Sequence, residues 1–269
     1  MANDTVQRNT RWVQALDRLL QVLNLDEDHP IRILTIEDGR EVVVVQPNAF
    51  TVSRIYATGR PDGARPHGMD SYYEYYFGKL EKYEEKNGTR EGFELAEEEW
   101  QTLFEESFYR YTRYLLFAGI KRWDDVRRDT DTNLAVTNLA REYAPSEIAW
   151  QSYQYKGYMI MMNSIAKAEL SLQEDDPNTA LQQIDVGIQQ IGEFCGECLR
   201  EEHGEAENIT RERYLSNLIE FRSDLETLGT EDSDDDDRGD TDEEQDDTDL
   251  LTELERLLNE VDTPDTERE

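Results

Sequence analysis

Apolar residues recur at helical spacing over most of this chain. Residues 98–143 and 146–198 share one layout: an aromatic-rich amphipathic helix, a short break and a second amphipathic helix. The breaks lie at 119–122 and 174–177, where a glycine or a proline interrupts the apolar stripe. This pattern predicts a mainly α-helical body of antiparallel helical hairpins, with one helix running from residue 146 to the second break. Two further helices are predicted at 70–86 and 209–228.

The apolar pattern changes near the N-terminus, where β-branched residues form short continuous runs. Asp38-Gly39 lies between two of these runs and indicates a tight hairpin, because both central residues of such a turn need positive φ. We therefore expect a helix and a small antiparallel sheet ahead of the helical body. The predicted elements are a helix at 9–25 and strands at 31–36, 41–45 and 50–56.

Charge is the extreme property of the composition, with 62 Asp and Glu against 28 Lys and Arg and a net charge of −34. Residues 229–269 carry 20 acidic and 3 basic residues, so half of the net charge lies there. A stretch with this much like charge and few apolar residues is expected to be disordered. It contains one short amphipathic helix, predicted at about 249–260, whose leucines, Leu254 and Leu257 among them, are expected to order on a partner or on the body of the chain.

These patterns divide the chain into three parts: an α+β piece at 1–60, a helical-hairpin domain at 61–228 and an acidic tail at 229–269. The negative charge argues against nucleic acid or anionic lipid as a partner through a generic basic face. It permits a protein or peptide partner, including a basic one. We find no leader peptide and no apolar run that could span a bilayer, so a cytoplasmic protein is expected. The oligomeric state stays open.

The two breaks align: Trp123-Asp124-Asp125-Val126 matches Pro177-Asn178-Thr179-Ala180. The stretch 115–126 resembles the turn of a tetratricopeptide hairpin. The interval from Val126 to Ala180 is 54 residues rather than about 34, so the helices must be longer than in that repeat.

The segment 65–76, Arg-Pro-His-Gly-Met-Asp-Ser-Tyr-Tyr-Glu-Tyr-Tyr, joins this body to the N-terminal piece. The combination resembles a little-characterised bacterial family with a tetratricopeptide-like body. Several members of that family carry a short C-terminal UvrB/UvrC motif, a helical hairpin for protein–protein contact. Here that motif is absent or reduced to the single helix at 249–260. The resemblance implies an interaction protein and not an enzyme.

Cys195, Cys198 and His203 form the one metal-like pattern, C-x₂-C-x₄-H. Zinc is held by four ligands in a structural site and favours thiolates, so these three residues would need a fourth. The alternative is that both cysteines end a helix, one packed and one exposed. No other cofactor is expected.

The loop of Arg65, His67 and Gly68 is the best candidate for an anion-binding or enzyme site, since its Arg and His are held by Pro66 and glycine. The alternative is that it only orders the entry to the following Tyr-rich helix. Exposed aromatic residues on helices form interfaces, but they also pack helices together. The aromatic candidates for partner contact are Tyr72, Tyr73, Tyr155 and Tyr158.

No catalytic constellation emerges from the chain. We therefore expect a non-enzymatic interaction scaffold or adaptor that binds a peptide or helix on the helical hairpins. Two alternatives remain: a zinc-binding regulatory protein that uses Cys195, Cys198 and His203, and an enzyme or anion-binding protein with its site at 65–68.

Overall fold

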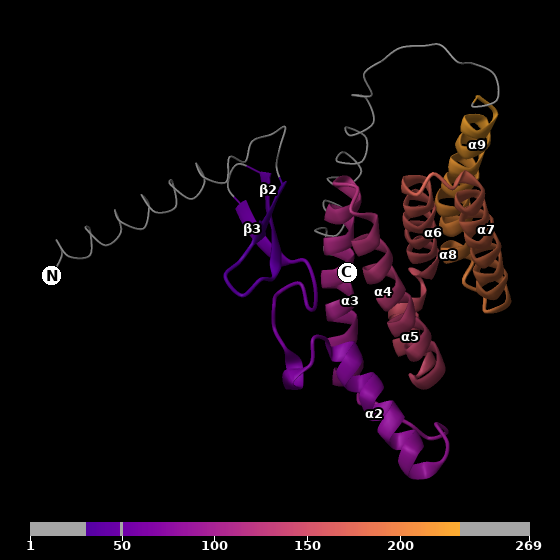
Figure 1. Cartoon of the computed structure of the whole chain (residues 1–269). Coiled ribbons are helices and arrows are strands. Elements are labelled where there is room, and N and C mark those ends of the chain that lie inside the picture. The colour runs from indigo at the N-terminus through magenta and orange to yellow at the C-terminus, as the bar shows by residue number, and fades with distance from the viewer. Residues whose placement is uncertain (1–30, 49–50, 232–269) are drawn as a thin grey trace, which may run out of the picture. The chain divides into compact units, whose positions relative to one another are not determined.

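The computed structural model describes residues 31–48 and 51–231 (Figure 1), so the predicted helices at 9–25 and 249–260, with Leu254 and Leu257, lie outside the described residues. The described chain falls into two compact units, one ending at Ser71 and the other beginning at Tyr72. It is mainly helical and has a small antiparallel sheet near the N-terminus, which confirms the predicted fold class.

The first unit contains a three-stranded sheet in the order β1 (Ile31–Thr35), β2 (Glu41–Asn48), β3 (Thr51–Tyr56). The central strand β2 holds the valine run, and its four valines are all buried because strands flank it on both sides. The prediction that both central turn residues take positive φ is wrong, because only Gly39 does so, at 85°. The Gly39 amide donates to the Ile36 carbonyl at 2.9 Å, so the loop is a turn followed by a left-handed glycine.

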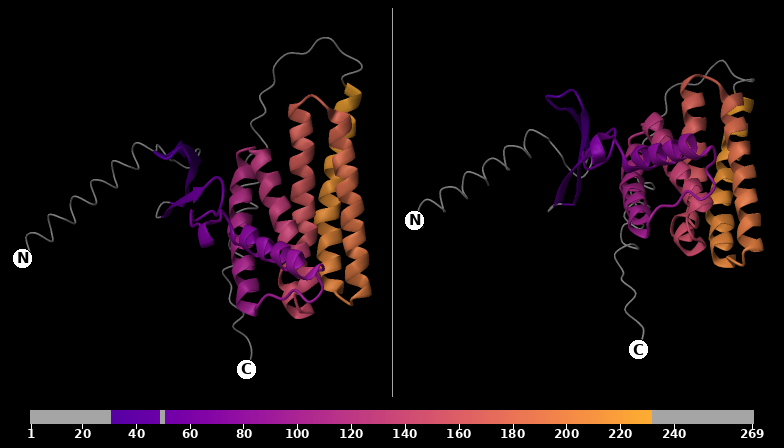
Figure 2. Two further views of the ribbon diagram at one scale, coloured as in Figure 1. Left: turned by 60° about the horizontal axis from the view of Figure 1, so that its bottom comes forward. Right: turned by 90° about the horizontal axis from the view of Figure 1, so that it is seen from below.

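The second unit is helical throughout, and each long helix packs against the next along the chain. Figure 2 shows the last three long helices, α6, α7 and α9, side by side. The helices are α2 (Tyr72–Asn87), α3 (Glu97–Gly119), α4 (Trp123–Tyr143), α5 (Ser146–Tyr153), α6 (Lys156–Gln173), α7 (Pro177–Arg200), α8 (Gly204–Ile209), the π-helical segment η2 (Thr210–Leu215) and α9 (Ser216–Glu231).

Both predicted breaks are confirmed, but the helix predicted from residue 146 to the second break is wrong. It is two helices, and Tyr155 separates them with φ −92° and ψ 2°. No glycine or proline marks this position. Tertiary packing explains the break: α5 packs on α4, whereas the first turn of α6 meets η2 so closely that a Cβ at Gly157 would lie 2.6 Å from Thr210 Cγ2. The last helix also begins earlier than predicted, at Gly204, and contains the π-helical segment.

The same turn ends α3, α6 and α7. After α3, the Arg122 amide donates to the Phe117 carbonyl and the Lys121 amide donates to the Ala118 carbonyl, which is the Schellman arrangement. The left-handed position that glycine usually occupies is filled here by a residue with a side chain. These residues are Lys121, Asp175 and Glu202, with φ of 55°, 56° and 63°.

The α3–α4 hairpin is joined by one buried ion pair, and a second buried pair lies within α3. Arg113 donates from Nε to Asp129 Oδ2 at 2.6 Å and from Nη2 to Asp129 Oδ1 at 2.7 Å, and both side chains are 2% exposed. Two turns nearer the start of α3, Glu106 is fully buried and pairs with Arg110. Glu106 also accepts the amide of Tyr72 at 2.8 Å, so it fixes the first turn of α2.

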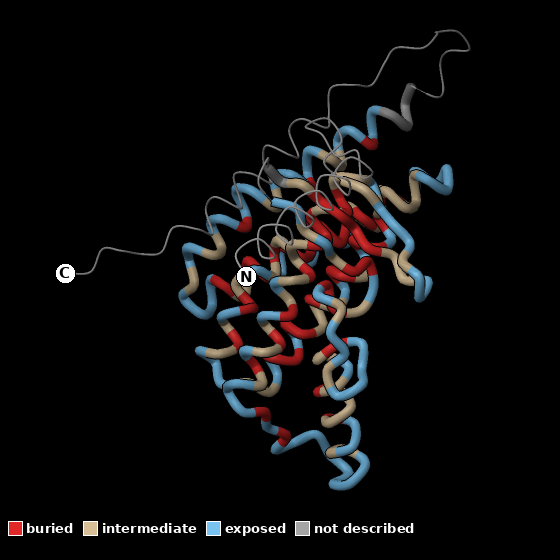
Figure 3. Tube along the Cα trace, turned by 90° about the vertical axis from the view of Figure 1, so that its left-hand side faces the viewer, coloured by how far each residue is buried: buried red, intermediate tan, exposed pale blue. Residues whose placement is uncertain are grey.

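The α6–α7 hairpin is joined by small apolar residues instead. A Cβ at Gly187 of α7 would lie 2.2 Å from Ser164 Oγ of α6 and 3.1 Å from Leu218 of α9, so this glycine lets three helices approach closely. On the same two helices, Ala166 of α6 and Ala180 of α7 are completely buried. In Figure 3 the buried positions recur along the helices, and the exposed positions gather on their outer turns.

Candidate functional site

One side of the helical unit is hollowed along α6, which lies between α4 and α7. A first hollow of about 250 Å³ opens at the start of α6, and a second of about 540 Å³ opens at its end. All the residues that line them come from these three helices or from the turn after α6. The first is lined by Leu134, Asn138, Lys156, Ile160, Gln190, Glu193, Phe194 and Glu197, and the second by Asp124, Arg127, Lys167, Leu170, Ser171, Glu174 and Gln183.

The two hollows lie at the two ends of one stripe along α6, which we call the α6 face, and between them Asn163 is buried and donates to Thr130 and Asp131 of α4. Along α6 the lining residues run from Lys156 to Glu174 and recur at steps of three, four or seven residues, so they share one side of the helix. At 1.5 Å per residue this stripe is about 27 Å long. The α6 face is therefore long enough for a ligand much larger than a metabolite.

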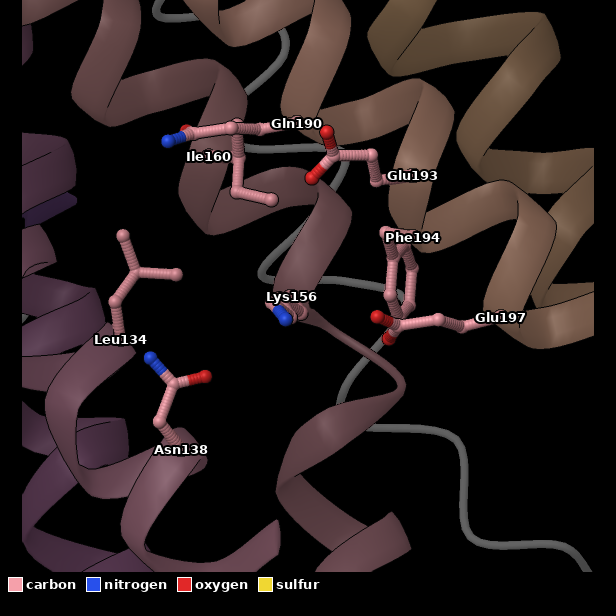
Figure 4. Close-up of a pocket in the computed structure, with 8 residues that line it drawn as sticks. All are labelled: Leu134, Asn138, Lys156, Ile160, Gln190, Glu193, Phe194 and Glu197. Atoms are coloured by element: carbon pink, nitrogen blue, oxygen red, sulfur yellow. The ribbon is translucent and has the colours of Figure 1, made fainter.

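The first hollow has an apolar floor and a charged rim (Figure 4). Ile160 and Phe194 are 3% and 1% exposed, so both are almost completely covered and only their edges reach the hollow. The carboxylates of Glu193 and Glu197 come from α7, and the ammonium of Lys156 comes from α6. Five of the eight lining residues are polar or charged, so the hollow is more polar than a typical small-molecule pocket.

A chain of hydrogen bonds holds the rim of the first hollow. Tyr153 Oη donates to the Glu197 carboxylate and accepts a hydrogen bond from Lys156 Nζ at 3.0 Å. Lys156 Nζ also lies 4.7 Å from the centre of the Tyr153 ring. Burial, and then the hydrogen bond to Glu197, raises the pKa of Tyr153, so its hydroxyl stays protonated at neutral pH. The tyrosine thus fixes both charged groups beside the hollow.

The second hollow is more polar, and its charges are paired. Arg127 donates to Asp124 at 2.9 Å, and Lys167 lies 3.7 Å from Asp131 at the edge of the same stripe. Leu170 is the single apolar residue of its lining. This end of the α6 face therefore offers a wetter surface.

The other side of α6 is filled by aromatic rings. Tyr158 contacts Tyr111 of α3 at 5.9 Å between ring centres and Tyr214 of η2 at 5.3 Å. It lies two residues from both Lys156 and Ile160, so its side chain leaves the helix on the opposite side from the first hollow. The structure places Tyr158 in half-buried packing, and Tyr155, which is 57% exposed, lines neither hollow.

Tyr72 and Tyr73 lie half-buried on the first turn of α2. Tyr72 stacks with Tyr76 at 6.0 Å between ring centres, and Tyr73 contacts Phe77 at 5.6 Å. Burial raises the pKa of Tyr73. Both residues thus take part in the packing of α2. Helix packing was the alternative to partner contact for these aromatic residues.

Cys195 and Cys198 are both free and both about 1% exposed, so the expectation that one is exposed is wrong. Cys198 packs with Tyr153 and Phe194, and burial raises its pKa to about 11. Its thiol is therefore neutral at pH 7. His203 instead stacks on Trp150 at 3.5 Å between ring centres. Within residues 31–48 and 51–231, no group of three His, Cys, Asp or Glu side chains is placed to hold a metal ion.

The loop at 65–68 lies in the first unit and forms a single helical turn, η1 (Pro66–Gly68). Arg65 pairs with Asp70 at 2.8 Å, and both side chains are more than half exposed. His67 is exposed and has a positive φ of 52°. Neither of the two hollows along α6 includes a residue of this loop.

The sequence did not single out Lys156, Glu193 or Glu197. A signal for the last two exists: they lie one turn apart on α7 and flank Phe194, at the edge of its apolar stripe. Comparisons of the chain with protein-family models, with curated proteins and with solved structures gave no match. Across the part of the chain that the structure describes, we find no helix long and apolar enough to cross a membrane.

Proposed function

We propose that this protein is a non-enzymatic interaction scaffold and that its α6 face binds a peptide or a helix. The observation that carries this proposal is the pair of hollows along one stripe of α4, α6 and α7. A stripe of about 27 Å matches roughly 18 residues of helix or about eight residues of extended peptide. An apolar floor with a polar rim is the usual composition of such interfaces.

The architecture supports a scaffold as well. The helices α3 and α4, and α6 and α7, form two hairpins whose connecting turns are both of the Schellman type, as a body built from helical hairpins would have. Successive antiparallel helices of this kind leave extended surfaces for partners. The resemblance of 65–76 and of the helical body to a family of interaction proteins agrees with this function.

The test is selection of a displayed library of random 18-residue peptides on the full chain, followed by affinity measurement on two variants. Gln190→Trp puts a large ring into the first hollow. Gln182→Trp makes the same exchange at an exposed position of the same helix that lines neither hollow. We expect the selected peptides to bind the wild type and Gln182→Trp alike and to lose about tenfold or more in affinity on Gln190→Trp, which corresponds to about 1.4 kcal/mol. Equal affinity for the two variants would refute the proposal, and so would a selection that enriches no peptide.

A further inference from the structure

The first hollow has the chemistry of a pocket for one long cationic side chain. We infer that it receives an arginine, or less well a lysine, from the partner, and that this residue is the anchor of the bound segment. The inference rests on the proposed function, because it names the chemistry of the partner at the same α6 face. It is argued from the floor, the rim and the charges of the hollow.

The floor suits the methylene stem of such a side chain. Leu134 of α4 is partly exposed at the hollow, and Ile160 of α6 and Phe194 of α7 lie beneath it, 3% and 1% exposed. Arginine and lysine bury their aliphatic stems along apolar surfaces of this kind and keep the charged group at the rim. A short acidic or polar side chain would leave this floor uncovered.

The rim suits the charged end. Glu197 accepts a hydrogen bond from Tyr153, and Glu193 accepts one from Gln189 at 2.9 Å. A carboxylate can accept about four hydrogen bonds, so both retain capacity toward the hollow. A guanidinium presents its donors in a planar fork that matches carboxylates, which favours arginine over lysine. Asn138 and Gln190 add carbonyl oxygens at the same rim.

The cation already present does not neutralise the rim completely. Lys156 is a single positive charge beside two carboxylates, and it is engaged by the oxygen and the ring of Tyr153. In the second hollow two cations, Arg127 and Lys167, face Asp124 and Glu174 of the lining and the adjoining Asp131. At longer range, the net charge of −34 attracts cationic partners to the whole chain. The two hollows thus carry a similar local charge, and the first is assigned the anchor because its lining has three apolar residues against one in the second.

The test uses a labelled 18-residue helical peptide of leucine and alanine with four arginines along its polar edge. The control peptide carries citrulline, the neutral isostere, at those four positions. Affinities are measured at 0.15 M salt for the full chain and for two double variants of equal charge change. Glu193→Gln/Glu197→Gln neutralises the rim, and Glu212→Gln/Glu220→Gln neutralises two exposed acids that line neither hollow.

We expect the rim variant to bind the arginine peptide about tenfold more weakly than the wild type. The control variant should change by less than about twofold, because screened surface charges contribute little. The citrulline peptide should bind every protein weakly. A gain-of-function variant, Asn138→Asp, adds a carboxylate to the rim and should tighten binding of the arginine peptide severalfold, which excludes misfolding as an explanation.

Equal weakening by the two double variants would overturn the inference, since it would mean that the net charge alone attracts the peptide. Failure of the arginine peptide to bind the wild type would also overturn it. These results differ from failure of the proposed function. If the display selection yields peptides that are sensitive to Gln190→Trp but contain no arginine or lysine, the α6 face is a binding face and the cationic anchor is wrong.

Discussion

The α3–α4 and α6–α7 hairpins have the same hydrophobic pattern and the same connecting turn, yet different contacts join them. In α3–α4, the buried pair of Arg113 and Asp129 spans the two helices. In α6–α7, Gly187 allows backbones and short side chains to approach closely. A shared period of apolar residues therefore fixes the outline of a hairpin without fixing the chemistry of its interface.

The difference bears on the α6 face. The apolar, closely packed α6–α7 pair brings Ile160 and Phe194 together as the floor of the first hollow. On the α4 side, several buried side chains are polar, and helices joined by such specific pairs have a fixed register. On this side Asn163 of α6 donates to Thr130 and Asp131 of α4, so the α4–α6 contact is polar where the α6–α7 contact is close-packed.

The largest expected effect is at the ion pair of the first hairpin. Asp129→Ala leaves the Arg113 guanidinium buried without its bidentate partner, which should lower the free energy of unfolding by about 3–5 kcal/mol. Urea denaturation followed by circular dichroism measures this. The double variant Arg113→Met/Asp129→Leu removes both charges and should be close to neutral. A single-variant loss below about 1 kcal/mol, the value of an exposed pair, would contradict the assignment.

The buried thiol of Cys198 in the second hairpin makes the free energy of unfolding depend on pH in the alkaline range. Burial raises the pKa of Cys198 from 9.0 to about 11, so only the unfolded thiol ionises between these values. The contribution of the neutral Cys198 thiol to the free energy of unfolding is fully present below about pH 8.5. It is lost as pH rises toward 11, by roughly 2–3 kcal/mol in all. The free energy of unfolding, measured by denaturation at pH 8, 9 and 10, should decline less steeply with pH for Cys198→Ala than for the wild type. Parallel declines would contradict a buried, neutral thiol.

Close approach in the second hairpin is tested by two glycines of α7. Gly187→Ala should cost about 1–3 kcal/mol, because its Cβ would lie 2.2 Å from Ser164 Oγ. Gly192→Ala is the matched control, since no heavy atom lies within 4 Å of its Cβ position, and it should stabilise the helix by about 0.5–1 kcal/mol. Thermal melting of the two proteins should shift in opposite directions. A destabilised Gly192→Ala would mean that α7 tolerates no change on any side.

Substitutions in the shared Schellman turn should have the smallest effect on stability, and the effect should be the same in both hairpins. Lys121 and Asp175 have left-handed backbones, which cost a residue with a Cβ about 1 kcal/mol relative to glycine. Lys121→Gly and Asp175→Gly should each raise the unfolding free energy by about 0.5–1 kcal/mol. If one variant stabilises and the other destabilises, the two turns are not equivalent.

The positions of the helices and strands followed closely from the sequence. Glycine at 119, proline at 177 and the β-branched runs before residue 57 are local signals, and local signals fix where elements begin and end. The break at Tyr155 was not predicted because its cause is tertiary: α5 follows α4, while Gly157 brings α6 against η2. The sequence also gave no warning of the π-helical segment at 210–215.

The candidate site was less accessible to prediction. Tyr158 is an aromatic residue on a helix, and nothing in its spacing says that three other tyrosines surround it. The first hollow depends on residues from three helices that are far apart in the sequence, such as Leu134 and Glu197. Their convergence follows from helix packing, which a single amphipathic stripe does not specify.

The most direct test of the α6 face as a binding face is methyl NMR of the full 31.5 kDa chain, with and without a display-selected peptide. Methyl groups of Leu134 and Ile160 report on the first hollow, and those of Ile209 and Ile219 report on exposed positions that line neither hollow. We predict that saturating peptide shifts the Leu134 and Ile160 signals and leaves the Ile209 and Ile219 signals in place. Shifts confined to Ile209 and Ile219, with Leu134 and Ile160 unchanged, would contradict the proposed binding face.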